Sequence, residues 1–105
     1  MNQVNLVGRI TKDLEIKYTS AQTAKVVFNI AINSKDRTDY PRIIVWGKQA
    51  ENLEKYCKKG SLVGVSGRIQ TGSYEKDGQP VYTTDVYAEH IEFLSWDKKA
   101  ESEEY

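Results

Sequence analysis

Cysteine and histidine are almost absent from this chain of 105 residues, which holds one of each, Cys57 and His90. A single cysteine excludes an internal disulfide, and these two side chains cannot supply the usual zinc-binding sets of Cys and His within one chain. They also lie far apart in the sequence, so no nucleophile–base pair is indicated. We therefore expect no metal, no cofactor and no catalytic activity.

Long apolar runs are missing as well. No segment approaches the roughly 18 apolar residues that a membrane helix needs. The N-terminal sequence MNQVNLVGRITKD lacks the apolar stretch of a signal peptide. The sequence thus predicts a cytoplasmic protein without a membrane partner.

An excess of charge of one sign is also lacking, since the formal net charge is zero. The distribution is uneven, however. Residues 1–95 hold 13 Lys and Arg against 11 Asp and Glu, whereas residues 96–105 hold 2 against 4. A weakly basic body is therefore followed by a short acidic end, and the placement of a few cations decides whether the chain suits nucleic acid.

What the chain has in abundance is alternation of apolar and polar residues, which predicts strands. The segment 4–10 alternates, and 14–18 is interpreted as the same strand resumed after a bend at Lys12 and Asp13. In 61–74, Val63, Val65 and Ile69 share one side, and Arg68, Gln70 and Tyr74 share the other. Together the strands are predicted at 4–18, 25–33, 38–48, 61–74 and 80–94, with a polar turn at 34–39 and an Asp-Gly turn within 75–79.

One segment breaks this alternation. In 48–59, Ala50, Leu53 and Cys57 recur at helical spacing, and Gly60 is the expected C-terminal stop. A helix between the third and fourth of five strands is typical of the OB-fold. We therefore predict an all-β domain over residues 1–95, a five-stranded OB-fold barrel with one helix, and a short flexible acidic tail over 96–105.

The stretch TDYPRIIVWGK (38–48) puts Tyr40, Arg42, Ile44 and Trp46 on one side of a strand. This side is too polar for a core and too aromatic for an ordinary wet surface. A tryptophan in a strand is more often structural than a binding platform, and Tyr74 beside a hairpin could equally be a cross-strand packing residue. The residue pattern alone therefore leaves both interpretations open.

Long strings of the sequence resemble the bacterial-type single-stranded DNA-binding protein family. They include MNQVNLVGRITKDLEIKYT, VVFNIAINS and WGKQAENLEKYCKKGSLVGVSGRIQTGSYEKDG, and the similarity runs in order from Met1 to about Leu94. The resemblance implies an OB-fold that coats single-stranded DNA during replication, recombination or repair without catalysis. It also implies a homo-oligomer, usually a tetramer.

Carried over by resemblance, the stacking aromatics of the family fall on Tyr40, Trp46 and Tyr74. Bases offer a π-face whatever their identity, so such a surface binds with little sequence preference. Arg42, between two of the aromatics, would meet phosphate or stack on a base. Further candidates for phosphate contacts, each on a non-core face or at a strand end, are Arg9, Lys12, Lys25 and Arg68.

The chain departs from the family in three places. The turn at 34–39 lacks the aromatic residue that many members carry, and Gly72 and Ser73 stand where basic residues are common. The sequence given ends at SEEY, without the acidic tip containing proline and phenylalanine that recruits partner proteins. Recruitment by that route is therefore not expected, and a phage, plasmid or accessory member, or a trimmed chain, fits this ending. The alternative function is an OB-fold subunit that binds protein in a replication or primosome assembly.

Overall fold

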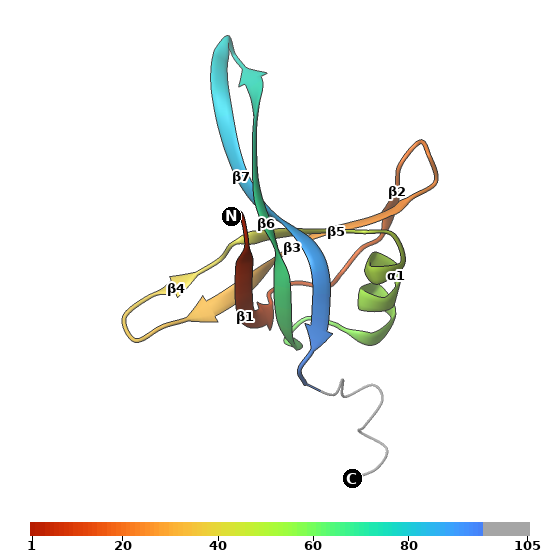
Figure 1. Ribbon diagram of the computed structural model, residues 1–105. Helices are drawn as coiled ribbons and strands as arrows, with labels where there is room; N and C mark the ends of the chain where they lie inside the picture. Colours follow the sequence, from red (N-terminus) through yellow and green to blue (C-terminus); the bar gives the residue numbers. More distant parts are fainter. Residues whose placement is uncertain (96–105) are drawn as a thin grey trace.

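The computed structural model describes residues 1–95 (Figure 1). The acidic tail expected at 96–105 lies outside the described residues. Within the described residues, seven strands and one helix follow in the order β1 (Val4–Ile10), β2 (Lys17–Tyr18), β3 (Ala24–Asn33), β4 (Thr38–Asp39), β5 (Arg42–Trp46), α1 (Gly47–Tyr56), β6 (Leu62–Lys76) and β7 (Gln79–Phe93).

The five longer strands form a closed ring. Neighbouring strands pair in the order β1-β6-β7-β5-β3, and a further pairing of β1 with β3 closes the ring. Only the β5–β7 pair is parallel among these ladders. Helix α1 comes between β5 and β6, so it lies between the third and fourth long strands. The predicted OB-fold architecture is thereby confirmed.

The core of the ring follows directly from the alternation in the sequence. In β3, Val26, Phe28 and Ile30 are fully buried, and in β5, Ile43 and Val45 are fully buried as well. Of the three residues predicted at helical spacing, Ala50 and Leu53 lie in the helix and Cys57 directly follows it, and all three belong to the same buried cluster. Burial of these side chains removes apolar surface from water at roughly 25 cal/mol per Å², which is the main force closing the ring.

Three predicted boundaries are wrong, and the one at Tyr40 is described with the candidate site below. Residues 14–18 do not continue β1, because only Lys17 and Tyr18 pair with β3. Leu14 and Ile16 nevertheless pack against the core from an irregular segment. The helix ends at Tyr56 rather than 59, because the next residue is extended and buries its side chain. Gly60, with a φ of 95°, therefore serves the turn into β6 and not the helix end.

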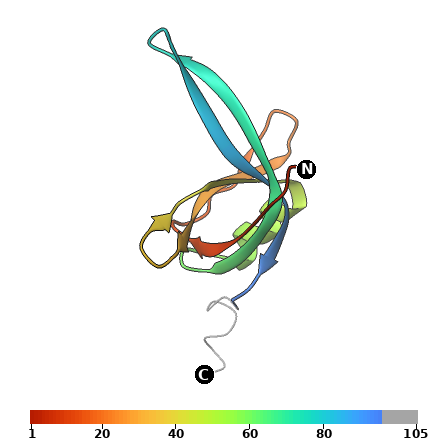
Figure 2. The same ribbon diagram turned by 60° about the vertical axis from the view of Figure 1, so that its left-hand side comes forward.

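Strands β6 and β7 form a long hairpin that projects from the ring (Figures 1 and 2). Its turn has positive φ at Asp77 (53°) and Gly78 (78°), the geometry of the predicted Asp-Gly turn. Ile69 was expected on the core side, yet it is 37% exposed. The expectation fails because, from about this residue onward, the hairpin has no strand of the ring to pack against.

A bulge marks the base of this hairpin. Ser66 pairs with His90 but Gly67 pairs with Ala88, so Glu89 is an extra residue in β7. Gln49 of α1 spans the bulge, since its side-chain amide donates to the Glu89 carbonyl oxygen at 2.8 Å and its oxygen accepts from the amide of Ile91 at 3.0 Å. The helix thereby fixes the point at which the hairpin leaves the ring.

Candidate nucleic-acid interface

The outward sides of β3, β5, β7 and β6 join into one surface, which we call the outer face. The strand registers set its rows. Asn29 pairs with Arg42, the Arg42 side chain lies 3.5 Å from Asp85, and Asp85 pairs with Gln70. The next row runs Val27, Ile44, Tyr87 and Arg68, and Lys25 pairs with Trp46 in a third row. Paired residues point to the same side of a sheet, so these side chains share the outer face.

Trp46 is an exposed aromatic at the end of β5, and Tyr40 is an exposed aromatic two residues before its start. Trp46 is 36% exposed and Tyr40 is 61% exposed. Ile44 belongs to the same alternating set but is only 3% exposed, because Val27 and Tyr87 flank it in the sheet. The ammonium of Lys25 lies 4.9 Å from the centroid of the Trp46 ring. A ring already in contact with a cation is a platform suited to an anionic chain that carries flat bases.

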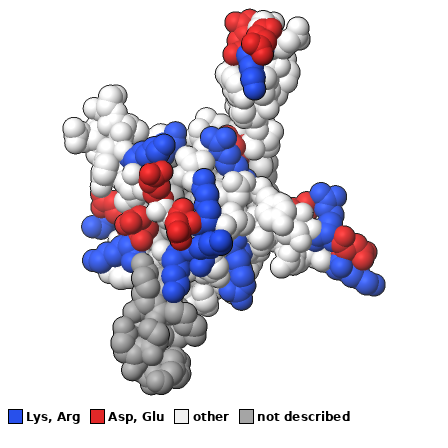
Figure 3. Space-filling model, turned by 180° about the vertical axis from the view of Figure 1, so that it is seen from behind, with Lys and Arg blue, Asp and Glu red and all other residues white. Residues whose placement is uncertain are grey.

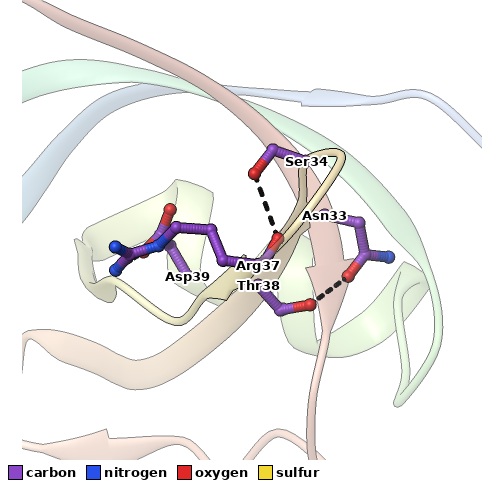
Figure 4. Close-up of polar contacts among 5 residues, drawn as sticks. All are labelled: Asn33, Ser34, Arg37, Thr38 and Asp39. Carbon is purple, nitrogen blue, oxygen red and sulfur yellow. Dashed lines mark hydrogen bonds and ion pairs between the residues drawn. The ribbon is translucent and has the colours of Figure 1, made fainter.

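Tyr40 does not lie in a strand, contrary to the prediction, but links β4 to β5. Its carbonyl oxygen accepts a hydrogen bond of 2.9 Å from the side-chain amide of Asn29. The preceding hairpin is closed by its own polar groups (Figure 4). The Ser34 hydroxyl donates to the Arg37 carbonyl at 3.0 Å, and Arg37 forms an ion pair with Asp39 at 2.6 Å. The backbone at Tyr40 is thus held by Asn29, and the hairpin before it is held by its own side chains.

Both arginines of the outer face have acidic partners. The Nε atom of Arg42 lies 3.5 Å from Asp85, a carboxylate whose side chain is only 13% exposed. Arg68 lies 3.7 Å from Glu89, and its guanidinium carbon is 5.5 Å from the centroid of the Tyr87 ring. A guanidinium has five N–H donors, so these pairs leave donors free for phosphate oxygens.

A groove of about 490 Å³ opens beside these residues. Its lining consists of Lys12, Asp13, Glu15, Lys17, Lys25, Val27 and Arg42. Three of the cations predicted from the sequence, Lys12, Lys25 and Arg42, are therefore brought together. Lys17 was missed, because only the pairing of β2 with β3 places it opposite Lys25.

Three other predicted residues lie apart from the groove. Arg9 on β1 donates to the Gly60 carbonyl oxygen at 2.9 Å and does not line it. Arg68 lies across the outer face on β6. Tyr74, on the projecting hairpin, is 56% exposed and has the same strand parity as Arg68 and Gln70. The hairpin thus extends the outer face beyond the ring.

Charges of both signs are mixed on the face of the protein seen in Figure 3. Seen from behind, Lys and Arg alternate with Asp and Glu on the body of the protein (Figure 3). The tip of the hairpin carries Glu75, Lys76 and Asp77, and both signs are visible there. Within residues 1–95 there is no group of three or more His, Cys, Asp or Glu side chains that could hold a metal ion. The same residues contain no helix long and apolar enough to cross a membrane.

Comparison with known proteins decides the family. Residues 1–94 match the single-strand binding protein family. The chain belongs to this family. The predicted resemblance is thereby confirmed over the whole of the described domain except its last residue.

Curated relatives of this family are similar along most of the chain. A single-stranded DNA-binding protein of Clostridium tetani is 46% identical over 97% of this chain and 76% of its own length. The single-stranded DNA-binding protein 3 of Clostridium acetobutylicum is 47% identical over 91% of this chain and 72% of its own length. A protein of the same name from Listeria innocua is 46% identical over 90% of this chain, which spans 64% of that relative.

Proposed function

We propose that this protein binds single-stranded DNA without catalysis and with little dependence on sequence, and so protects it during replication, recombination or repair. The observation that carries the proposal is the pairing of an exposed Trp46 with Lys25 on the outer face of the family's fold. The names of the relatives support it, since each is a single-stranded DNA-binding protein.

In this proposal the bases stack on the exposed rings of Trp46, Tyr40 and Tyr74. Stacking of this kind contributes about 1–3 kcal/mol per base. It requires only a flat π-surface on the ligand, which all four bases provide. Duplex DNA keeps its bases stacked on one another, so it cannot offer them to the same rings.

The cations supply the second part of the affinity. Lys12, Lys25 and Arg42 line the groove next to Trp46, and Arg68 lies on the same outer face. Contacts between these groups and phosphates release counterions, which makes the affinity fall with rising salt. Arg9 remains a candidate for a phosphate contact outside the groove, although its guanidinium donates a hydrogen bond to a backbone carbonyl in the free protein.

We assign binding to the domain of residues 1–95 and propose that several copies assemble, as a tetramer by analogy with the family, in the cytoplasm. The single chain described by the structure already contains the rings and the groove. The expected effect of assembly is therefore on the length of DNA covered and not on the stacking chemistry.

The test is a titration with oligo-dT while tryptophan fluorescence and molecular mass are followed. The chain has two tryptophans, so a Trp96→Phe background makes the fluorescence report on Trp46 alone. In this background we expect quenching on binding. The Trp46→Ala variant lacks the fluorophore, so its affinity is measured by the anisotropy of dye-labelled oligo-dT, with an expected loss of roughly 5- to 150-fold, corresponding to about 1–3 kcal/mol.

Two further variants give this experiment its controls. Trp46→Phe keeps an aromatic face and is expected to retain most of the affinity. Tyr56→Ala removes a ring that is 49% exposed on helix α1, away from the outer face, and is expected to leave affinity unchanged. A folded wild-type protein that binds no oligo-dT would refute the proposal and favour the protein-binding alternative.

A further inference from the structure

Lys17 and Lys25 lie directly opposite each other in the β2–β3 ladder, and both line the groove. Two like charges in a directly opposed pair destabilise a sheet. Within residues 1–95 neither ammonium group takes part in an ion pair. The only recorded partner of the Lys25 ammonium in this part of the chain is the Trp46 ring. The free protein thus holds two uncompensated cations face to face.

The segment that carries Lys12 and Lys17 is anchored. Leu14 and Ile16 pack against the hydrophobic core between these two lysines. The alternate residues Asp13 and Glu15 are exposed and line the same groove. Neither carboxylate forms an ion pair with a groove lysine among the described residues. The lining therefore has four cations and two anions, and the positive excess remains available to a ligand.

We propose that Lys17 and Lys25 together hold one phosphate group of the bound nucleic acid strand, the phosphate next to the base that stacks on Trp46. This proposal rests on the proposed function and adds Lys17 as a binding residue. Side chains at directly opposed positions start from Cβ atoms about 5 Å apart, so two flexible lysines can reach the same phosphate. The contact of Lys25 with Trp46 places this phosphate beside the stacked base.

A shared phosphate makes a specific prediction for salt dependence. In Lys17→Ala or Lys25→Ala alone, the remaining lysine still neutralises the phosphate, so the slope of log K against log salt changes little. In the double variant the phosphate has neither lysine to neutralise it, and the slope of log K against log salt flattens by about 0.7 in total. This corresponds to a loss of about 8-fold in affinity for oligo-dT at 0.05 M salt and about 4-fold at 0.15 M, vanishing near 1 M.

The experiment compares four proteins in oligo-dT titrations at several salt concentrations: wild type, the two single variants and the double variant. Lys55→Ala, on the last turn of α1, is the matched control for loss of one positive charge. Lys17→Arg is expected to bind like wild type. Urea unfolding of Lys17→Ala is expected to show an unchanged or higher midpoint, because the repulsion with Lys25 is removed.

The outcomes separate the possibilities. If the slope of the double variant flattens by about 1.4, the two lysines bind two separate phosphates, and the proposal of one shared phosphate is overturned. A double variant that binds like wild type and like Lys55→Ala would overturn the site, while normal wild-type binding would leave the proposed function standing. Failure of the wild type itself to bind oligo-dT would instead refute the proposed function.

Discussion

Substitution of Gly67 by alanine is expected to destabilise the protein more than any other glycine-to-alanine change in β6. A Cβ atom built on Gly67 lies 2.1 Å from the Tyr87 carbonyl oxygen and 3.0 Å from the Ala88 Cα atom. Both are backbone atoms of the paired strand, so no side-chain rotation can relieve the overlap. The strands themselves must move apart at the bulge.

The size of the effect follows from that movement. An ordinary contact between carbon and oxygen is about 3.3 Å, so β6 and β7 must separate locally by about 1 Å. Ladder hydrogen bonds of ordinary length would then be stretched beyond their useful range. Overpacking costs about 1–3 kcal/mol, each lost hydrogen bond costs about 1 kcal/mol, and the lower entropy of the unfolded alanine chain returns about 0.4–1 kcal/mol. We expect a net loss of about 2–3 kcal/mol in the free energy of unfolding.

Urea unfolding, followed by circular dichroism, measures this loss. All variants are compared at one protein concentration, because the unfolding midpoint of a protein that self-associates depends on concentration. Gly64→Ala is the matched control in the same strand. Its Cβ would lie 3.4 Å from the Leu94 Cδ1 atom and 3.5 Å from the Glu92 Cβ atom, which are ordinary van der Waals contacts, so no atom has to move. The control is expected to change stability by less than about 1 kcal/mol. Equal midpoints for Gly67→Ala and Gly64→Ala would refute the reasoning.

Three further predictions concern the helix and the outer face. Gln49→Ala removes the acceptor of the Ile91 amide, and an unsatisfied partly buried donor is expected to cost about 1–3 kcal/mol in urea unfolding. Tyr74→Ala is expected to weaken oligo-dT binding in fluorescence titrations, whereas Tyr82→Ala, on the opposite face of the same hairpin, is expected to leave it unchanged. Arg42→Ala is expected to flatten the plot of log K against log salt by about 0.7, and an unchanged slope would exclude a phosphate contact.

The parts of the fold that follow from periodicity could be predicted from the sequence. β1, β3 and the core side of β5 agree with the alternation, because each buries one face against the same core. The prediction that residues 14–18 continue the first strand was wrong, and the reason is not the periodicity. Its alternation is real, and Leu14 and Ile16 do pack inward, but a strand also needs a hydrogen-bonding partner, and β3 offers one only to Lys17 and Tyr18.

The candidate site was predictable only in part, for the same reason. The sequence places Tyr40, Arg42 and Trp46 on one side of a strand, and the structure exposes all three. Which residues of other strands lie beside them depends on register, which no local pattern contains. Lys17 is the clearest example, since it is unremarkable in the sequence and becomes one half of an opposed lysine pair only when β2 meets β3.

A net charge of zero is compatible with the proposed binding because the two arginines and the groove lysines are held differently. Arg42 and Arg68 each lie next to a carboxylate, which limits what they add to long-range attraction but fixes their orientation on the sheet. Of the two pairs, Arg42–Asp85 is screened less by salt, because the Asp85 side chain is only 13% exposed. Lys17 and Lys25 have no such acidic partner in the described chain, and together with the arginines they supply the part of the affinity that salt removes. At high salt, therefore, the binding that remains is expected to depend on the aromatic rings, and Trp46→Ala should then cost a larger share of the total than any lysine substitution.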